Sequence, residues 1–189
     1  TSQPAPGDFL QVIAPLTEQY QAIIVITIAG GLSGTIQSAR TATQLTAAKK
    51  LYILDSGTTA VGMVHFADIA LKLADQGWPV EQIVAHLKRC IDSTRTMFVP
   101  KTLEYLYKGG RIGRAAALVG GILQIRPVLY LADGKVDVLD KVRTHQRAVA
   151  RMLEELYSWP DLEYIGVVHI AAPELAEQGV EQIRPRYPK

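Results

Sequence analysis

The first part of the chain alternates between short apolar runs and longer segments with helical character. Residues 22–29 (AIIVITIA) are almost continuously apolar and β-branched, and residues 51–54 (LYIL) form a second such run. Strands that are apolar on both faces are typical of a parallel sheet covered by helices on both sides. The pattern therefore predicts two parallel strands.

Helical segments follow each of these runs. Residues 36–48 have helix-forming composition, and Ser33 or Thr35 stands where an N-cap is expected. Residues 60–76 are apolar nearly all round and are followed by Gly77, a typical helix C-terminal residue.

The same alternation continues as far as residue 99. Apolar residues recur every three or four positions from 80 to 91, which predicts an amphipathic helix, and residues 96–99 suit a short strand. Alternating strands and helices predict a parallel-sheet α/β sandwich, which we assign to a first domain of residues 1–99.

From residue 100 onward the pattern is that of antiparallel structure. Residues 128–131 and 136–139 are strand-like and flank Asp133-Gly134, a dipeptide that favours a tight hairpin. The remaining pattern predicts a helix with its apolar face between 149 and 156, a strand at 165–170 (IGVVHI) and a helix at 175–183. We expect a second domain, residues 100–189, of the α+β class with an antiparallel sheet.

Composition narrows the class of protein. The 189 residues are 48% hydrophobic and 20% charged, enough for one sizeable core or two small ones and too apolar for a disordered chain. A formal net charge of +2 argues against a surface devoted to nucleic acid or anionic lipid. Cys90 is the only cysteine, so an intrachain disulfide is excluded and a reducing, cytoplasmic location fits best.

Neither membrane insertion nor a metal site is predicted. The longest apolar run, residues 22–29, is far shorter than the roughly 20 residues that cross a bilayer, and the N-terminus lacks the features of a signal peptide. The four histidines, at positions 65, 86, 145 and 169, show no metal-binding spacing. We expect no metal and no cofactor.

The turn at residues 30–35 (GGLSGT) is the first candidate for ligand binding. Backbone N–H groups at a helix start attract anions, and here Ser33 adds a hydroxyl and Gly34 an unshielded amide, a combination that suits a carboxylate or a phosphate. A capped helix with glycines for close packing gives the same pattern, so both interpretations stay open. Thr35 stands where the nucleophile elbow of hydrolases needs glycine, which argues against a serine hydrolase.

Positive charge is concentrated in the second half. Ten basic and four acidic side chains lie between residues 101 and 151, a net charge of +6. Arg111 and Arg114 stand on a glycine-rich turn within this segment, KGGRIGR at residues 108–114. Such a surface suits a phosphate or an acidic protein partner, whereas the few aromatic residues in it argue against nucleic acid.

Several short motifs follow one another in a fixed order along the chain. The first half carries TSQP at residues 1–4 and GLSGT at residues 31–35. The second half carries TLEYL at residues 102–106 running into KGGRI at 108–112, followed by PVL at 127–129, DGK at 133–135 and KVR at 141–143. Together these motifs resemble those of the DegV family of bacterial fatty-acid-binding proteins, and the resemblance covers essentially the whole chain.

This resemblance implies a two-domain protein that is a carrier, not an enzyme. In the family a long-chain fatty acid lies between the domains, and its carboxylate is held by hydroxyls that correspond here to Thr1 and Ser33, with Gly34 beside them and Arg111 near the head group. Family members present the carboxyl group to a separate fatty-acid kinase subunit, which makes acyl phosphate; Arg111 and Arg114 are our candidates for the head-group vicinity or for docking that partner.

The resemblance also bears on the two ends of the chain. The family pattern includes a strand before TSQP and a strand with a histidine-containing loop near its end, neither of which is in this sequence, so we expect a chain truncated at both ends.

The alternative function is a small-metabolite phosphoryl-transfer or kinase-like domain that uses the turn at residues 30–35. A purely protein-interacting domain is a third possible function.

Overall fold

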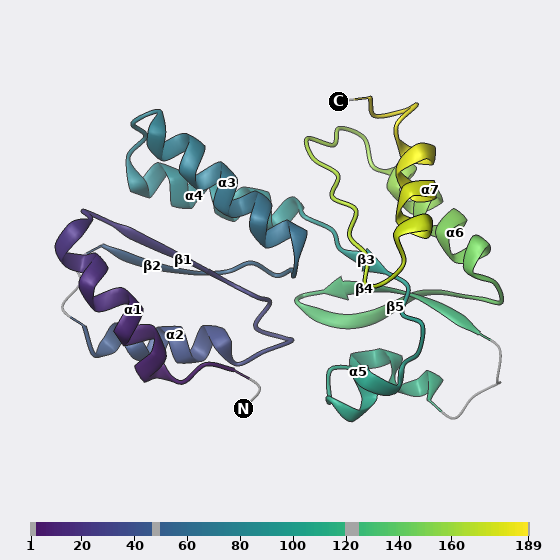
Figure 1. The fold of residues 1–189 in the computed structure, drawn as a ribbon, viewed down its shortest axis with the longest axis horizontal. Coiled ribbons are helices and arrows are strands. Elements are labelled where there is room, and N and C mark those ends of the chain that lie inside the picture. Colours follow the sequence, from purple (N-terminus) through teal and green to yellow (C-terminus); the bar gives the residue numbers. More distant parts are fainter. Residues whose placement is uncertain (1–2, 47–49, 120–124, 189) are drawn as a thin grey trace. The chain divides into compact units, whose positions relative to one another are not determined.

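The structure is a computed structural model that describes residues 3–46, 50–119 and 125–188 (Figure 1). The chain divides into two compact units, one of Thr1–Thr96 with Asp133–Lys135 and one of Met97–Ala132 with Val136–Lys189. A parallel sheet lies in the first unit and an antiparallel sheet in the second, which confirms the predicted fold class. Compactness does not show independent folding, so the domain limits 1–99 and 100–189 stay a prediction.

The first unit is a parallel pair of strands between two layers of helices. Its elements are α1 (Pro6–Gln19), β1 (Ile23–Thr27), α2 (Thr35–Gln44), β2 (Leu51–Asp55), α3 (Val61–Asp75) and α4 (Val80–Ser93). Ile23 pairs with Leu51 and Thr27 with Asp55, so both strands end at the same edge. Figure 1 shows α1 and α2 on one side of the strands and α3 and α4 on the other.

The core of this unit lies under α3 and α4. Phe66 of α3 is 1% exposed, and α4 buries Ile83, Val84 and Leu87, the three- and four-residue spacing that the sequence shows. These side chains pack together with Leu54 of β2. This packing holds the sheet in place, and the turns described below follow the ends of its strands.

Helix α1 was not predicted from the pattern. Pro6 occupies the first helical position, and the Asp8 carboxylate accepts a hydrogen bond from the Ala5 N–H at 2.7 Å, so the helix start is well capped. Ile13 is its buried residue, and Pro15 lies inside the helix. The helix packs on α2.

The second unit contains an antiparallel sheet of order β3-β4-β5. Its elements are β3 (Met97–Phe98), α5 (Glu104–Lys108), a 3-10 helix (Gly113–Leu118), β4 (Arg126–Ala132), β5 (Lys135–Val142), α6 (His145–Ser158) and α7 (Pro173–Ile183). Asp133 and Gly134 both have positive φ, 50° and 72°, as a type I′ hairpin turn requires. The predicted hairpin is therefore confirmed. Val128 of β4, Val142 of β5 and Ala148 of α6 are buried together, and their contact packs α6 against the sheet.

Three local predictions are wrong. The strand expected at residues 96–99 is β3, but it pairs antiparallel with β4 and does not join the parallel sheet, because pairing is decided by partners that local composition does not specify. Residues 165–170, all of them described, form no strand, because β-branched composition favours extended backbone but does not supply a pairing partner. The N-cap of α2 is Gly34, not Ser33 or Thr35, and Thr35 is already the first helical residue. Within the ranges that the structure describes, no helix is both long and apolar enough to cross a membrane.

Candidate functional site

The turn between β1 and α2 stands at the carboxyl end of the parallel strands, where open α/β sheets carry their ligands. The N–H groups of Leu32 and Ser33 both donate to the carbonyl oxygen of Ala29, at 2.9 and 3.1 Å, which curls the chain into a compact loop. The described residues supply no acceptor for the Gly34 N–H. Gly34 therefore offers a backbone donor at the start of α2, where the helix dipole also favours an anion.

Two hydroxyl groups flank this amide. The Ser33 Oγ and Thr35 Oγ1 atoms lie 2.8 Å apart in a hydrogen bond that either can donate, and both residues are half-buried. The Thr35 N–H also points at Ser33 Oγ, at 3.4 Å. Because a hydroxyl can donate one hydrogen bond while accepting others, this pair can reorient toward a carboxylate oxygen.

The segment that carries the TSQP motif packs directly on this turn. The Gln3 side-chain amide donates to Ser38 Oγ at 3.3 Å, and Ser38 is 5% exposed. A Cβ atom on Gly34 would collide with the end of the Gln3 side chain, its Cδ at 2.7 Å, so the missing side chain of Gly34 leaves room for this close approach. Gln3, Ser33 and Gly34 are thus brought together; Thr1 lies outside the described residues.

Asp55, which the pattern did not single out, links the two turns at this edge of the sheet. Its carboxylate accepts from the Gly30 N–H, 3.1 Å from either oxygen, and from the Gly57 N–H at 2.9 Å. The neighbouring Ala29 N–H donates to the Thr58 carbonyl oxygen at 2.9 Å. An aspartate that ends a strand before Ser-Gly is typical of a side-chain-capped turn, and that signal could have identified it.

The two arginines of the KGGRIGR turn have partners within the second unit. Arg111 donates to the Gly109 carbonyl oxygen at 2.6 Å. Arg114 forms a 3.0 Å ion pair with Asp137, whose side chain is only 15% exposed. Head-group binding and partner docking by Arg111 and Arg114 stay predictions.

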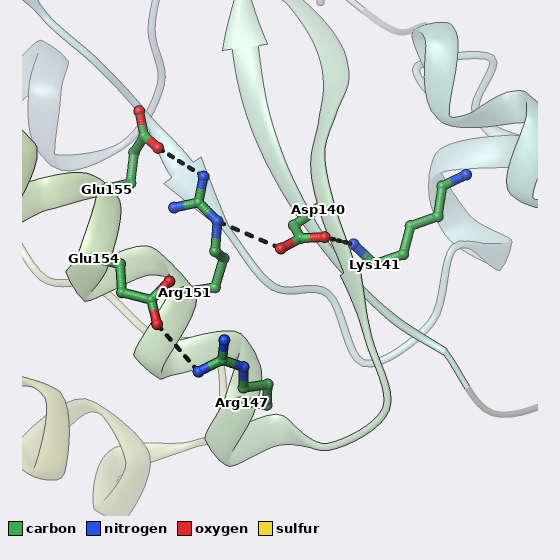
Figure 2. Close-up of polar contacts among 6 residues, drawn as sticks. All are labelled: Asp140, Lys141, Arg147, Arg151, Glu154 and Glu155. Atoms are coloured by element: carbon green, nitrogen blue, oxygen red, sulfur yellow. Dashed lines mark hydrogen bonds and ion pairs between the residues drawn. The ribbon is translucent and has the colours of Figure 1, made fainter.

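Other basic residues of this unit are paired with acids on β5 and α6, as Figure 2 shows. Arg151 bridges Asp140 at 3.4 Å and Glu155 at 2.9 Å, while Arg147 pairs with Glu154 at 3.1 Å. Glu154 and Glu155 lie just past the basic segment of residues 101–151. The net charge of +6 therefore overstates the positive charge on this surface.

The rest of the described surface offers no competing site of clear chemistry. In residues 3–46, 50–119 and 125–188, no group of three or more His, Cys, Asp or Glu side chains is placed to hold a metal ion. A hollow of about 370 Å³ beside α7 is lined by His169, Glu177 and Arg184 among others. None of the binding residues that the sequence predicts lines it.

Comparison with known proteins gives consistent matches along the chain. A family model described as "Uncharacterised protein, DegV family" matches residues 1–189. A DegV domain-containing protein of Listeria innocua is 33% identical over the whole chain, which spans 68% of that protein's length.

Solved structures agree with the sequence match. The fatty acid binding DegV family protein of Streptococcus agalactiae is 28% identical with a TM-score of 0.91, over 98% of this chain and 67% of that one. The Fatty Acid Kinase (Fak) B3 protein of Streptococcus pneumoniae, loaded with linoleic acid, is 26% identical with a TM-score of 0.85, over 99% of this chain and 67% of that one.

Proposed function

The chain belongs to the DegV family, and on that premise we propose that it binds a long-chain fatty acid and acts as a carrier, not as an enzyme. The observation that carries this proposal is that the solved relatives from S. agalactiae and S. pneumoniae bind fatty acids, the second of them linoleic acid, and share this fold over nearly the whole of the chain.

The turn at the end of β1 supports the same assignment. A carboxylate needs donors, and the Ser33 and Thr35 hydroxyls and the Gly34 N–H provide three of them at a helix N-terminus. We assign the fatty-acid carboxylate to Ser33 and Gly34, with Thr1 as a further hydroxyl donor. Such a site fixes the position of the head group without placing a full counter-charge against it.

The acyl tail supplies the affinity in this account. Burying a chain of about sixteen carbons contributes on the order of 12 kcal/mol at roughly 0.8 kcal/mol per methylene, before the costs of association are subtracted. Head-group contacts are individually much weaker, and they set the orientation of the ligand. The protein would therefore hold fatty acids by their tails and present their carboxyl groups.

Presentation implies a partner that uses the carboxyl group. We infer that a separate fatty-acid kinase subunit docks on the protein and phosphorylates the bound carboxylate, as the name of the S. pneumoniae relative suggests. Arg111 and Arg114 are the proposed docking or head-group residues. Because such a kinase consumes ATP, the proposed location is the cytoplasm.

Extraction under denaturing conditions, followed by mass spectrometry of the released small molecules, tests this proposal. The protein purified from cells is expected to release a fatty acid at close to one equivalent. The Ser33→Ala variant should retain less, whereas Ser93→Ala, which alters an exposed hydroxyl bonded to carbonyl oxygens of its own helix, should match the wild type. Release of a phosphorylated metabolite in place of a fatty acid would overturn the proposal.

A further inference from the structure

We propose that Asp55 is a positioning residue for the head-group site: its carboxylate holds Gly30 and thereby fixes the turn that carries Ser33 and Gly34. The inference rests on the proposed function, since it names a residue that sets the geometry of that site. Asp55 acts through the backbone, and no contact of its own with a ligand is required.

The geometry of the link is specific. Both carboxylate oxygens lie 3.1 Å from the Gly30 nitrogen, and one of them also accepts from Gly57 at 2.9 Å. A single side chain at the end of β2 therefore ties together the turns that follow both strands. Hydrogen bonds to an ionised acceptor are stronger than those between neutral groups, so this link constrains the turn more firmly than a backbone carbonyl would.

Gly30 is matched to this carboxylate. A Cβ atom at position 30 would lie 2.6 Å from Asp55 Oδ2 and 3.2 Å from Cγ2 of Ile36. The φ angle of Gly30 is not in the left-handed region, so close approach of Asp55 is the reason for glycine here. Gly30 and Asp55 therefore form one contact, in which the missing side chain of Gly30 leaves room for the Asp55 carboxylate.

Asp55 is exposed, so its link should matter more for local geometry than for global stability. Ser33 lies three residues beyond Gly30 in a loop closed by bonds to the Ala29 carbonyl oxygen. When Gly30 loses its acceptor, the start of this loop is less constrained, and Ser33 and Gly34 lose their fixed orientation. Hydrophobic contacts to the acyl tail would be unaffected.

Three variants separate this role from a general loss of structure. Asp55→Ser keeps an oxygen that can accept from Gly57 two residues on, but is too short to reach Gly30. Gly30→Ala pushes the carboxylate away while leaving it in the chain. Asp161→Ser makes the same substitution at an exposed aspartate in the second unit and serves as the control.

The readout compares two ligands with the same tail. Affinities for palmitate and for hexadecanol are measured on the wild type and on each variant, because only palmitate has a carboxylate to orient. We expect Asp55→Ser and Gly30→Ala to weaken palmitate binding about tenfold, the equivalent of one hydrogen bond to a charged group, and to leave hexadecanol binding unchanged. Asp161→Ser should alter neither affinity.

Amide hydrogen exchange gives a second readout that needs no ligand. The Gly30 amide should exchange faster in Asp55→Ser than in the wild type, whereas amides of α4 should keep their protection. The double variant Gly30→Ala with Asp55→Ser should bind palmitate no more weakly than the weaker of the two single variants, because both substitutions break the same contact.

The outcomes distinguish the inference from its premise. If the wild type binds neither ligand, the proposed function fails and the inference falls with it. If the wild type binds palmitate but Asp55→Ser and Gly30→Ala bind it equally well, the proposed function stands and the inference is overturned. Equal losses for palmitate and hexadecanol, additive losses in the double variant or unchanged exchange at Gly30 would likewise overturn it.

Discussion

At the scale of single residues, we propose that head-group binding depends most on the hydroxyl of Ser33. It lies 2.8 Å from the Thr35 hydroxyl at the start of α2. Replacing Ser33 with alanine removes one donor to a carboxylate, so the dissociation constant for palmitate should rise about tenfold. Isothermal titration calorimetry measures this change.

The control for that prediction is Ser93→Ala, whose hydroxyl donates only to the carbonyl oxygens of Arg89 and Cys90 in its own helix among the described residues. Its palmitate affinity should equal that of the wild type. If Ser33→Ala also binds like the wild type, Ser33 has no part in holding the carboxylate.

A second prediction concerns acid stability and rests on the pair Lys50 and Glu81, 3.0 Å apart. The bond to Lys50 lowers the pKa of Glu81 from its usual 4.5, and the same bond raises the pKa of Lys50 from its usual 10.5. A carboxyl group with a lowered folded-state pKa stabilises the fold above its unfolded-state pKa and loses that contribution as pH falls through the folded-state value.

The Glu81→Gln variant should therefore unfold slightly more easily than the wild type at pH 7, since an exposed ion pair contributes little, and the difference should shrink as the pH falls below 4.5. Urea unfolding at a series of pH values measures it. The matched control is Glu174→Gln, at an exposed carboxylate for which the described part of the chain shows no ion pair. A difference that stays constant across the acid range would contradict the assignment.

At the scale of elements, the turn that opens the 3-10 helix requires glycine. Gly113 has a φ of +54°, and a Cβ atom there would collide with the Val136 carbonyl group of β5. Gly113→Ala should lower the free energy of unfolding by about 2 kcal/mol, since it combines backbone strain with a steric clash.

Gly179 is the matched control, because it lies inside α7 and a Cβ atom there would meet nothing within 4 Å. Gly179→Ala should raise the free energy of unfolding by about 0.5–1 kcal/mol, the difference in helix propensity. Chemical denaturation of both variants tests the pair of predictions, and an equal effect at the two positions would contradict them.

The attachment of α6 to β5 depends more on Arg151 than on Arg147. The Arg151 side chain is 24% exposed and bridges the strand residue Asp140 and the helix residue Glu155, whereas Arg147 and Glu154 pair within the helix at 61% and 52% exposure (Figure 2). Arg151→Met should cost about 1–2 kcal/mol of unfolding free energy.

The comparison variant is Arg147→Met, which should cost less than about 0.5 kcal/mol, because exposed ion pairs contribute little. Urea midpoints of the two variants at moderate salt measure the difference. If Arg147→Met is as destabilising as Arg151→Met, the bridge to β5 has no special weight.

Local sequence signals predicted most of the elements but not those that depend on distant partners. The run AIIVITIA and the Asp133-Gly134 turn favour their structures through local composition alone. The run forms β1, and the turn joins β4 to β5 in the hairpin. IGVVHI at residues 165–170 is just as β-branched, yet strand formation needs a neighbour that no local pattern supplies. Helix α1 was not predicted, although Pro6 and Asp8 mark its start; Pro15 inside it is atypical of a helix.

At the scale of the whole molecule, two motifs that are far apart in the sequence come together in the fold. Gln3 of TSQP contacts the GLSGT turn, as motifs of one shared site should. The charge count was less informative, because Arg151 is paired with Asp140 and Glu155 in the folded chain. The Asp-Ser-Gly sequence could mark Asp55 as a turn residue, but its contact with Gly30 could not be inferred, since that contact exists only once β1 and β2 pair.

The central claim is that the turn at residues 30–35 holds the carboxylate of a fatty acid, and the most direct measurement is a palmitate titration followed by amide NMR of the delipidated protein. The account predicts saturable shifts of the Ser33, Gly34 and Thr35 amide signals at one equivalent, larger than those produced by hexadecanol. Saturable binding of palmitate that leaves these three amides unmoved would contradict it.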